Sequence, residues 1–315
     1  MKPILIANPG AAGGRVGREI ASFERAVADR FGPCEVRLSQ RPGGVEHLVR
    51  KAADEGAELI GLVGGDGTIG EAVNGVLGGD REVPEGLELV FLPAGTGGDF
   101  ARVIGMAEWI PDNGLSNCSP KKIDVGRAEI RGHDGEPVTR LFANIASTGA
   151  SAAIAEGVNQ TSKKLGRFGF AVGALKGLAA WRNRRIRLRV DDTVDREVDF
   201  NSVAVANGRC FGGGMKIAPN ARLDDGLLDV ITIEPLGPTR FVTQGRKLYK
   251  GTHLDLPEIT EDRGCEVRIE AIDDGSEPIP VEVDGEHPGF LPLCATILPE
   301  ALTLIAPWGR ADGAC

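Results

Sequence analysis

Residues 60–74 read IGLVGGDGTIGEAVN, and this stretch decides the fold of the N-terminal part of the chain. The apolar run at residues 59–63 has the character of a buried strand, and glycines interrupt it from Gly64 onward. Apolar residues at helix-face spacing follow in residues 69–77. A strand that runs through a glycine-rich turn into a helix presents backbone N–H groups at the helix N-terminus, and that geometry binds phosphate.

Asp66 lies inside this loop. A carboxylate repels phosphate unless it holds a cation or takes a proton, so the combination points to phosphoryl chemistry rather than simple anion binding. The alternative is a structural turn in which Asp66 and Thr68 act as helix caps. Gly65, Gly67 and Gly70 also fit the dinucleotide fingerprint G-x-G-x-x-G, but the next strand ends in PAGT instead of the required acidic residue.

The composition sets bounds on the class of protein. A chain of 315 residues favours two domains, and a formal net charge of −9 argues against a general nucleic-acid binder. Six cysteines without a C-x-x-C pair, and only four histidines, argue against a zinc site or a disulfide framework, and free thiols fit a reducing cytoplasm. Without a signal sequence or an apolar run of roughly 20 residues, we expect a cytoplasmic protein whose membrane association is peripheral and transient.

Up to about residue 120 the chain alternates between strands and helices. We expect strands at residues 4–7, 34–39, 59–63 and 87–92, and helices at residues 16–28, 45–53 and 69–77. This alternation is typical of a parallel sheet covered by helices. Three special loops open at the carboxyl ends of the strands, where ligands of open α/β sheets collect: residues 8–14, 64–68 and 93–99.

Beyond residue 120 the pattern becomes mainly that of strands. We expect them at residues 123–130, 138–145, 185–190, 198–206, 227–233, 265–272 and 280–283, with helices at residues 150–160 and 165–181. The fold class is therefore an α/β N-terminal nucleotide-binding domain plus a β-rich, antiparallel and sandwich-like C-terminal domain. We assign residues 1–120 to the first domain and residues 121–299 to the second, and residues 300–315 rejoin the first.

Two glycine-rich loops accompany the first one. Residues 93–102, PAGTGGDFAR, repeat the order of strand, glycine loop and acid at a helix start, and the alternative is a turn with Asp99 as N-cap. Residues 8–14, NPGAAGG, form a generic loop that gains interest from its position after the first strand. Two acid-containing loops on neighbouring strand ends favour a shared phosphate site over unrelated turns.

Two acidic motifs and one basic segment lie in the second domain. Asp224, Asp225 and Asp229 offer the oxygen ligands that hard cations prefer, although a lone Asp-Asp-Gly is more often a turn. The Asp-Gly-Glu at residues 284–286 is also most often a β-turn, or else a carboxylate pair for acid–base or metal work. Residues 181–189, WRNRRIRLR, are either a solvated strand face or a contact for anionic lipid headgroups.

Taken together and in this order, the motifs resemble the soluble bacterial diacylglycerol kinase and lipid kinase family, which shares a catalytic domain with sphingosine and ceramide kinases. The resemblance rests on residues 64–68, 93–102, 207–229 and 284–286 and covers nearly the whole chain. It implies an active site in the cleft between the domains and ATP-dependent phosphorylation of a lipid hydroxyl, with Mg²⁺. The implied partners are a lipid alcohol such as diacylglycerol and an anionic membrane surface, while the oligomeric state stays open, a dimer included.

The resemblance also implies roles for single residues. It implies nucleotide contacts from Asn8, Ser39, Gly64, Gly65, Asp66, Gly67, Thr68, Glu71, Gly95 and Thr96. Asp66 is implied as the acid beside the phosphates, and Asp284 and Glu286 as the catalytic acid–base pair, one of which draws the proton from the lipid hydroxyl. A structural magnesium site is implied at Asp225 with the carbonyls of Arg222 and Leu227.

One position departs from the family pattern, because Gly98 stands where an Asn is usual and a side-chain amide is therefore missing. NAD kinases also carry Gly-Gly-Asp-Gly, but their later Asn-Glu motif has no counterpart that we can place here. The Asp-Gly-Glu at residues 284–286 favours the lipid branch. An NAD kinase-like enzyme and a non-catalytic nucleotide-binding protein on the same fold are the alternatives.

Overall fold

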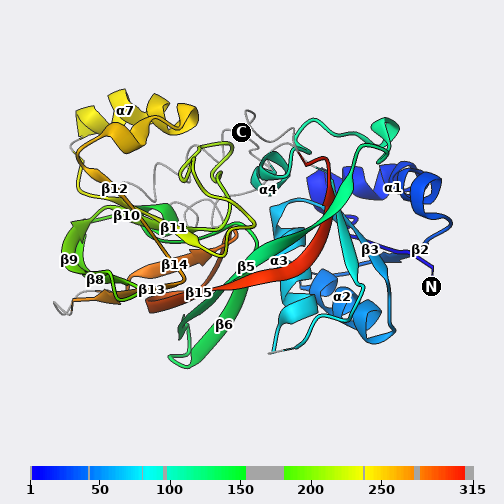
Figure 1. The fold of residues 1–315 in the computed structure, drawn as a ribbon, viewed down its shortest axis with the longest axis horizontal. Helices are drawn as coiled ribbons and strands as arrows, with labels where there is room; N and C mark the ends of the chain where they lie inside the picture. The colour runs from blue at the N-terminus through cyan, green and yellow to red at the C-terminus, as the bar shows by residue number, and fades with distance from the viewer. Residues whose placement is uncertain are drawn as a thin grey trace.

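The computed structural model describes residues 2–41, 43–79, 81–94, 98–153, 181–236, 238–272 and 277–308. It has an α/β half at the N-terminus and a β-rich half at the C-terminus, which lie side by side in Figure 1. One 15-stranded sheet runs through both halves. The expected fold class is confirmed. No helix among the described residues is long and apolar enough to cross a membrane.

The N-terminal half is a parallel sheet in the order β4-β3-β1-β2. Strands β1 and β3 are buried along their whole length, because helices flank them. The strands are β1 (Ile4–Ala7), β2 (Glu35–Leu38), β3 (Leu59–Gly64) and β4 (Glu88–Pro93), and the helices are α1 (Ala11–Phe31), α2 (Gly44–Asp54), α3 (Asp66–Leu77), α4 (Asp99–Val103) and the 3₁₀ turn η1 (Pro111–Asn113).

The C-terminal half is antiparallel and contains two apolar clusters. Its strands are β5 (Ser119–Gly132), β6 (Pro137–Phe142), β7 (Ile145–Gly149), β8 (Arg184–Val190), β9 (Val194–Phe200), β10 (Ser202–Ala206), β11 (Leu228–Ile233), β12 (Ile259–Gly264), β13 (Glu266–Ala271), β14 (Pro280–Val283) and β15 (Glu286–Ala306). Helix α7 (Pro238–Lys250) and the 3₁₀ turn η3 (His253–Asp255) lie between β11 and β12. Neither α7 nor β12 was expected from the apolar pattern, because both segments are rich in polar residues.

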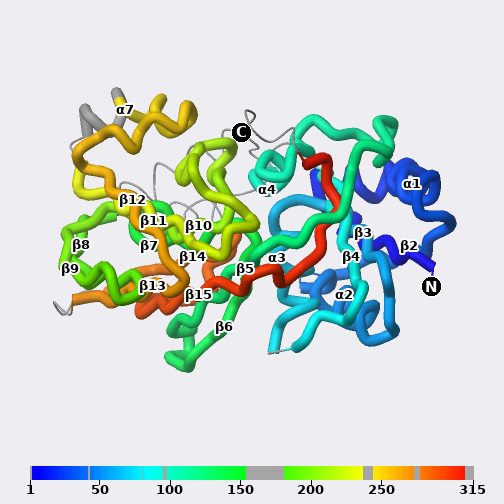
Figure 2. Tube along the Cα trace, viewed as in Figure 1, coloured from blue at the N-terminus to red at the C-terminus, as the bar shows by residue number. Residues whose placement is uncertain are grey.

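Strands β5 and β15 connect the two halves, as the tube in Figure 2 shows. They pair antiparallel over almost their entire length, from Gly289 opposite Gly132 to Ala306 opposite Ser119. Near its end β15 also pairs in parallel with β4. A continuous sheet therefore fixes how the edge of the parallel half faces the β-rich half.

Several expected boundaries differ in the structure. Residues 138–145 are not one strand, because the pairing breaks at residues 143 and 144 between β6 and β7. A similar break divides residues 198–206 between β9 and β10. Of the expected helix at residues 150–160, residues 150–153 are helical, and the rest of it lies outside the described residues, as does the expected helix at residues 165–181 apart from its last residue. Cys34, Cys265 and Cys294 are free thiols, but Cys210 is disulfide-bonded, so the expectation of free thiols is wrong there.

Candidate active site

Asp66 stabilises the N-terminus of a neighbouring helix. It is the first residue of α3, yet its Oδ2 accepts a hydrogen bond from the Asp99 N–H (2.9 Å) and its Oδ1 accepts one from the Phe100 N–H (3.0 Å), both in α4. Burial raises the pKa of Asp66, and the two N–H donors oppose that shift. The first and second glycine-rich loops therefore meet, and Asp66 is a cap for α4 rather than for its own helix.

Asp99 repeats this arrangement with the next motif. Its carboxylate accepts hydrogen bonds from the N–H groups of Gly213 (2.9 Å) and Gly214 (2.7 Å). Burial raises the pKa of Asp99 to about 6, and the negative charge of Asp66 adds to that effect. Arg102 Nε lies 3.8 Å from Asp99 Oδ1 and partly balances the charge. Two carboxylates thus connect the first loop, α4 and the glycines of residues 207–229 in series.

Gly98 lies beside this connection. A Cβ added at Gly98 would lie 3.8 Å from Asp66 Oδ1 and 3.1 Å from the Ala101 Cβ. A larger side chain at this position would therefore lie next to the Asp66 carboxylate, which is where the amide expected from the family pattern is missing.

Asp284 holds the break between β6 and β7. Its carboxylate accepts hydrogen bonds from the N–H groups of Ala143 (2.8 Å), Asn144 (3.1 Å) and Ile145 (2.9 Å). Asp284 has a left-handed backbone with φ 47°, as expected for the turn that the sequence suggested. Burial raises its pKa to about 7, and the charge of Glu282 adds to the shift. The motif therefore forms the expected turn, and the pKa of the Asp284 carboxyl group within it is raised.

Glu282 is a buried carboxyl group that the sequence analysis missed. Glu282 precedes Asp284 by two residues, and side chains two residues apart along a strand point to the same face. This spacing is the sequence signal that could have identified Glu282. Glu282 Oε2 accepts a hydrogen bond from the Ser147 hydroxyl (2.6 Å), and Oε1 accepts one from the Gly285 N–H. Burial raises the pKa of Glu282 to about 7. The glutamate thereby holds the middle of the Asp-Gly-Glu turn.

A small cavity of about 100 Å³ lies between this turn and the first glycine-rich loop. A Cβ added at Gly70 in α3 would lie only 3.6 Å from the Asp284 Cβ, so the helix and the turn are in close contact. Glu286 is exposed, and its carboxylate accepts no hydrogen bond from the described residues. Although the residue reaches the surface, the chain around its carboxyl group displaces water and raises the pKa of Glu286, and Arg140 opposes this shift. The cavity is lined by residues of α2, α3, β6 and the turn, among them Gly67, Gly70, Glu71, Arg140, Asp284 and Glu286.

Residues expected to contact the nucleotide follow the carboxyl ends of β1, β2 and β3. Asn8 comes after β1, and its Oδ1 accepts a hydrogen bond from the Gly10 N–H (3.0 Å). Ser39 comes after β2 and is buried. Thr68 packs on Gly64, where an added Cβ would lie 2.0 Å from the Thr68 Oγ1, so this position requires glycine.

Glu71 also belongs to the expected set, and it caps α2. Its Oε2 accepts hydrogen bonds from the N–H groups of Val45 (2.8 Å) and Glu46 (3.3 Å). The structure thus gathers the first loop, Glu71, Asp284 and Glu286 around one cavity. Gly95 and Thr96 lie outside the described residues.

In the loop where the magnesium site is expected, the carboxylates pair with arginine side chains. Asp225 Oδ1 accepts a hydrogen bond from the Leu227 N–H (3.2 Å), and Oδ2 pairs with the guanidinium of Arg263. Arg263 Nε also lies 3.1 Å from Asp229, which is completely buried. Arg222 pairs with Asp224. The described residues contain no group of three or more acidic, His or Cys side chains that could hold a metal ion. The expected site joins one carboxylate, that of Asp225, to the carbonyls of Arg222 and Leu227, and it stays a prediction.

Residues 184–189 of the basic segment lie in β8, where three of the arginines form ion pairs across the sheet. Arg185 pairs with Asp199 (3.0 Å) and Arg187 with Asp195 (2.7 Å). Arg189 lies 3.5 Å from Glu270. These cross-strand pairs favour the solvated strand face over a lipid contact.

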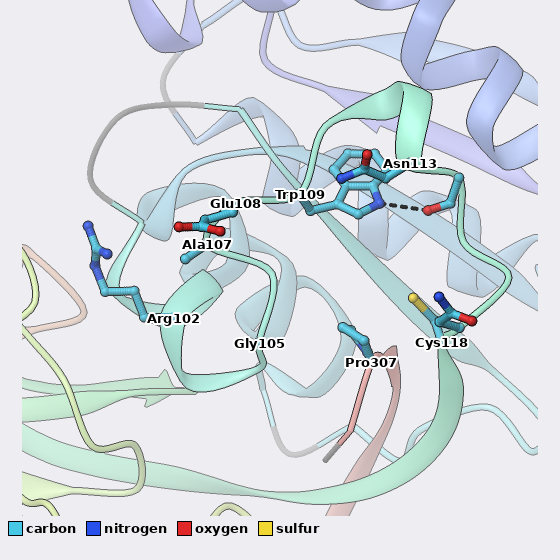
Figure 3. A pocket seen from close by; sticks show the side chains of 10 residues that line it. Arg102, Gly105, Ala107, Glu108, Trp109, Asn113, Cys118 and Pro307 are labelled. Carbon is cyan, nitrogen blue, oxygen red and sulfur yellow. Dashed lines mark hydrogen bonds between the residues drawn. The ribbon is translucent and has the colours of Figure 1, made fainter. Parts of the chain in front are cut away.

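A larger hollow of about 860 Å³ is lined by Arg102 of α4 and by residues that follow this helix in the chain, among them Trp109 and Cys118 (Figure 3). Trp109 forms part of its wall and donates a hydrogen bond from Nε1 to the Gly114 carbonyl (2.7 Å). None of the expected site residues that the structure describes lines this hollow. Those of the expected site residues that line a cavity therefore gather at the smaller one, between α3 and the Asp-Gly-Glu turn.

Solved structures share the complete two-domain fold. A diacylglycerol kinase from Bacillus anthracis str. Sterne superposes with a TM-score of 0.69 at 22% identity, covering 97% of this chain and 96% of that chain. Yeast NADH kinase complexed with NADH superposes with a TM-score of 0.52 at 12% identity, covering 99% of this chain and 86% of that chain. These likenesses define the class of fold, one that the two solved structures share with this chain.

The sequence comparisons narrow this class. Residues 2–128 match the diacylglycerol kinase catalytic domain, and residues 144–306 match the YegS C-terminal NAD kinase beta sandwich-like domain. A "Diacylglycerol kinase" of Mycobacterium tuberculosis (strain H37Rv) is 29% identical over 83% of this chain and 81% of its own length. A "Probable lipid kinase YegS-like" of Chromohalobacter salexigens is 32% identical over 88% of this chain and 85% of its own length. The chain belongs to the diacylglycerol kinase catalytic domain family of lipid kinases.

Proposed function

We propose that this chain transfers the γ-phosphoryl group of ATP, bound as its magnesium complex, to the hydroxyl of a diacylglycerol-like lipid. The observation that carries the proposal is the contact between α3 and the Asp-Gly-Glu turn. A phosphate-binding helix N-terminus and a pair of carboxyl groups line one cavity there, at the junction of the two halves. This combination suits phosphoryl transfer, in which the protein mainly positions the reactants and neutralises charge.

The nucleotide side of the proposal rests on the loop after β3. Backbone N–H groups from Gly65 to Thr68 form the N-terminus of α3 and would contact the phosphates. Asn8 and Ser39 follow the neighbouring strands β1 and β2, and we assign them to the nucleotide together with Glu71, Gly95 and Thr96. Magnesium would arrive with ATP and neutralise its phosphates.

The acceptor side rests on Asp284 and Glu286. One carboxylate takes the proton of the lipid hydroxyl, the freed oxygen attacks the γ-phosphorus, and the bond to the leaving ADP breaks. General base catalysis of this kind contributes about 10²–10⁴-fold. Because three backbone N–H groups already occupy the Asp284 carboxylate, we assign the base to Glu286 and the positioning of the turn to Asp284.

The test is a kinase assay with ATP against diacylglycerol, monoacylglycerol, sphingosine and NAD. We expect phosphorylated diacylglycerol as the main product, and a kcat about 10²–10⁴-fold lower in Glu286→Gln with unchanged ATP binding. Asp66→Asn should remove most turnover while the fold survives. The control is Asp112→Asn in η1. It removes one negative charge at an exposed position, as the test variants do at the site, and it should behave like wild type.

Other results would identify the alternatives. Phosphorylation of NAD alone would make the chain an NAD kinase-like enzyme. ATP binding without turnover on any acceptor would make it a nucleotide-binding protein. Wild-type kcat in both Glu286→Gln and Asp284→Asn would leave the Asp-Gly-Glu motif as a β-turn only.

A further inference from the structure

Helix α7 carries an unbalanced positive charge in an acidic protein. Its sequence, PTRFVTQGRKLYK, contains four basic residues and no acidic one, whereas the whole chain has a net charge of −9. Arg246 and Lys250 are exposed, and Lys247 is half-exposed. Tyr249 is 54% exposed, the highest value for a large hydrophobic side chain in the described residues.

The basic side chains at the exposed end of α7 differ from those of β8 in their contacts. Among the described residues no ion pair involves Arg246, Lys247 or Lys250, in contrast to the cross-strand pairs of Arg185 and Arg187 on β8. The first acidic residue after them along the chain is Asp255, an exposed residue in η3. The charges of Arg246, Lys247 and Lys250 are therefore available to an external anion.

Helix α7 is also attached to the loop that reaches the site. The Leu248 carbonyl accepts a hydrogen bond from the Lys216 N–H (2.9 Å), and a Cβ added at Gly251 would lie 3.1 Å from the Pro219 Cβ. The same loop includes Gly213 and Gly214, whose N–H groups donate to Asp99. One continuous segment therefore runs from the outer helix, drawn at the edge of the β-rich half in Figure 1, to the carboxylates at α4.

We propose that the exposed end of α7, formed by Arg246, Lys247, Tyr249 and Lys250, docks on the surface of an anionic lipid bilayer. This inference rests on the proposed lipid substrate, which requires the protein to work at a bilayer. Cationic side chains would contact lipid phosphates, and the tyrosine ring suits the interface between headgroups and water. Docking there would hold the loop of Lys216, and with it the glycines that contact Asp99, at the membrane.

The experiment is co-sedimentation with vesicles of phosphatidylcholine, with and without about one-third phosphatidylglycerol, at low salt and at about 0.5 M salt. Wild type should bind only the anionic vesicles, and salt should release it. The triple variant Arg246→Gln, Lys247→Gln, Lys250→Gln should bind roughly 10- to 100-fold more weakly. The matched triple variant Arg185→Gln, Arg187→Gln, Arg189→Gln loses the same three charges and should bind like wild type.

Vesicle binding needs neither ATP nor turnover, so it tests the docking surface separately from the kinase activity. Equal loss in both triple variants would mean that net charge alone matters, and equal binding in both, or no binding by wild type, would also overturn the proposal. Arg246→Lys keeps the charge and should bind normally, so weak binding by this variant would point to packing and contradict the electrostatic argument. With a short-chain, monomeric diacylglycerol the α7 variant should keep wild-type turnover.

Discussion

Glu282 lies beneath the Asp-Gly-Glu turn, and its two oxygens make different contacts. Oε1 accepts from the Gly285 N–H, and Oε2 accepts from the Ser147 hydroxyl on β7. A glutamine could keep both contacts, because its oxygen can accept from Gly285 and its amide can donate to the Ser147 oxygen. An alanine could make neither. The two substitutions therefore separate the hydrogen-bonding role of Glu282 from its charge.

We expect Glu282→Gln to keep a kcat within about threefold of wild type and Glu282→Ala to lose about tenfold or more, because a misplaced reacting group lowers the rate steeply. The folded-state pKa of Glu282, about 7, exceeds its ordinary value of 4.5. Its contribution to stability is thus present below pH 4.5 and is lost as pH rises through about 7. Thermal melting across that range should show a smaller loss in Glu282→Gln than in wild type, because the contributions of other buried carboxyl groups, such as Asp284 and Asp99, remain. Parallel melting curves would contradict the buried, titrating carboxyl group.

Asp284 and Glu286 should make the rate depend on pH. Burial raises the pKa of both, to about 7 for Asp284, and a general base works only when ionised. We therefore expect kcat/KM to fall on the acid side by about tenfold per pH unit, because protonation disables Glu286 as the base and, near pH 7, weakens the acceptor with which Asp284 holds the turn; the apparent pKa values belong to the pair. Because the charge of Glu282 raises the pKa of Asp284, the acid limb should move to lower pH in Glu282→Gln. An acid limb near pH 4 in wild type would contradict this assignment.

At the scale of elements, the sequence pattern predicted the strands and helices that are strongly apolar and periodic. The loop after β3, the helix that follows it and the turn at residues 284–286 could be found because glycine and Asp-Gly carry local signals. The break between β6 and β7 could not be found, because its cause is the Asp284 carboxylate about 140 residues away. The pairing of Asp66 with α4 escaped prediction for the same reason, since single residues do not reveal which N–H groups they will meet.

The loop of Asp225 allows a test of what balances its carboxylates: Arg263, which the local sequence does not reveal, or a metal ion. Arg263, which is distant in sequence, pairs with both Asp225 and the buried Asp229. We expect EDTA to leave the melting temperature unchanged, because a guanidinium already balances these carboxylates. Arg263→Met should lower the free energy of unfolding by about 1–3 kcal/mol, since it leaves Asp229 buried without its partner and Arg263 is itself partly exposed. A melting temperature that rises with Mg²⁺ and falls with EDTA would instead support the magnesium site expected at Asp225.

At the scale of the whole molecule, two kinds of connection join the halves. Strands β5 and β15 form a continuous sheet between them, and this connection is built from backbone pairing over many residues. The second connection is narrow and polar: Asp66 binds the N-terminus of α4, and Asp99 in α4 binds Gly213 and Gly214. Removing single side chains should barely affect the first connection but should open the second.

We therefore expect Asp99→Ala to loosen the loop of residues 207–229 without unfolding the protein. Two glycine N–H groups lose their acceptor, and a lost hydrogen bond to a charged group weakens an arrangement by about 1.5–3 kcal/mol. Hydrogen exchange at Gly213 and Gly214 should accelerate by roughly 10- to 100-fold, while amides of β5 and β15 stay protected. ATP affinity should change little, and lipid turnover should fall, because the loop that contacts α7 no longer holds its position. Asp112→Ala removes an exposed carboxylate and serves as the control; unchanged exchange at both glycines in Asp99→Ala would show that the sheet alone fixes the two halves.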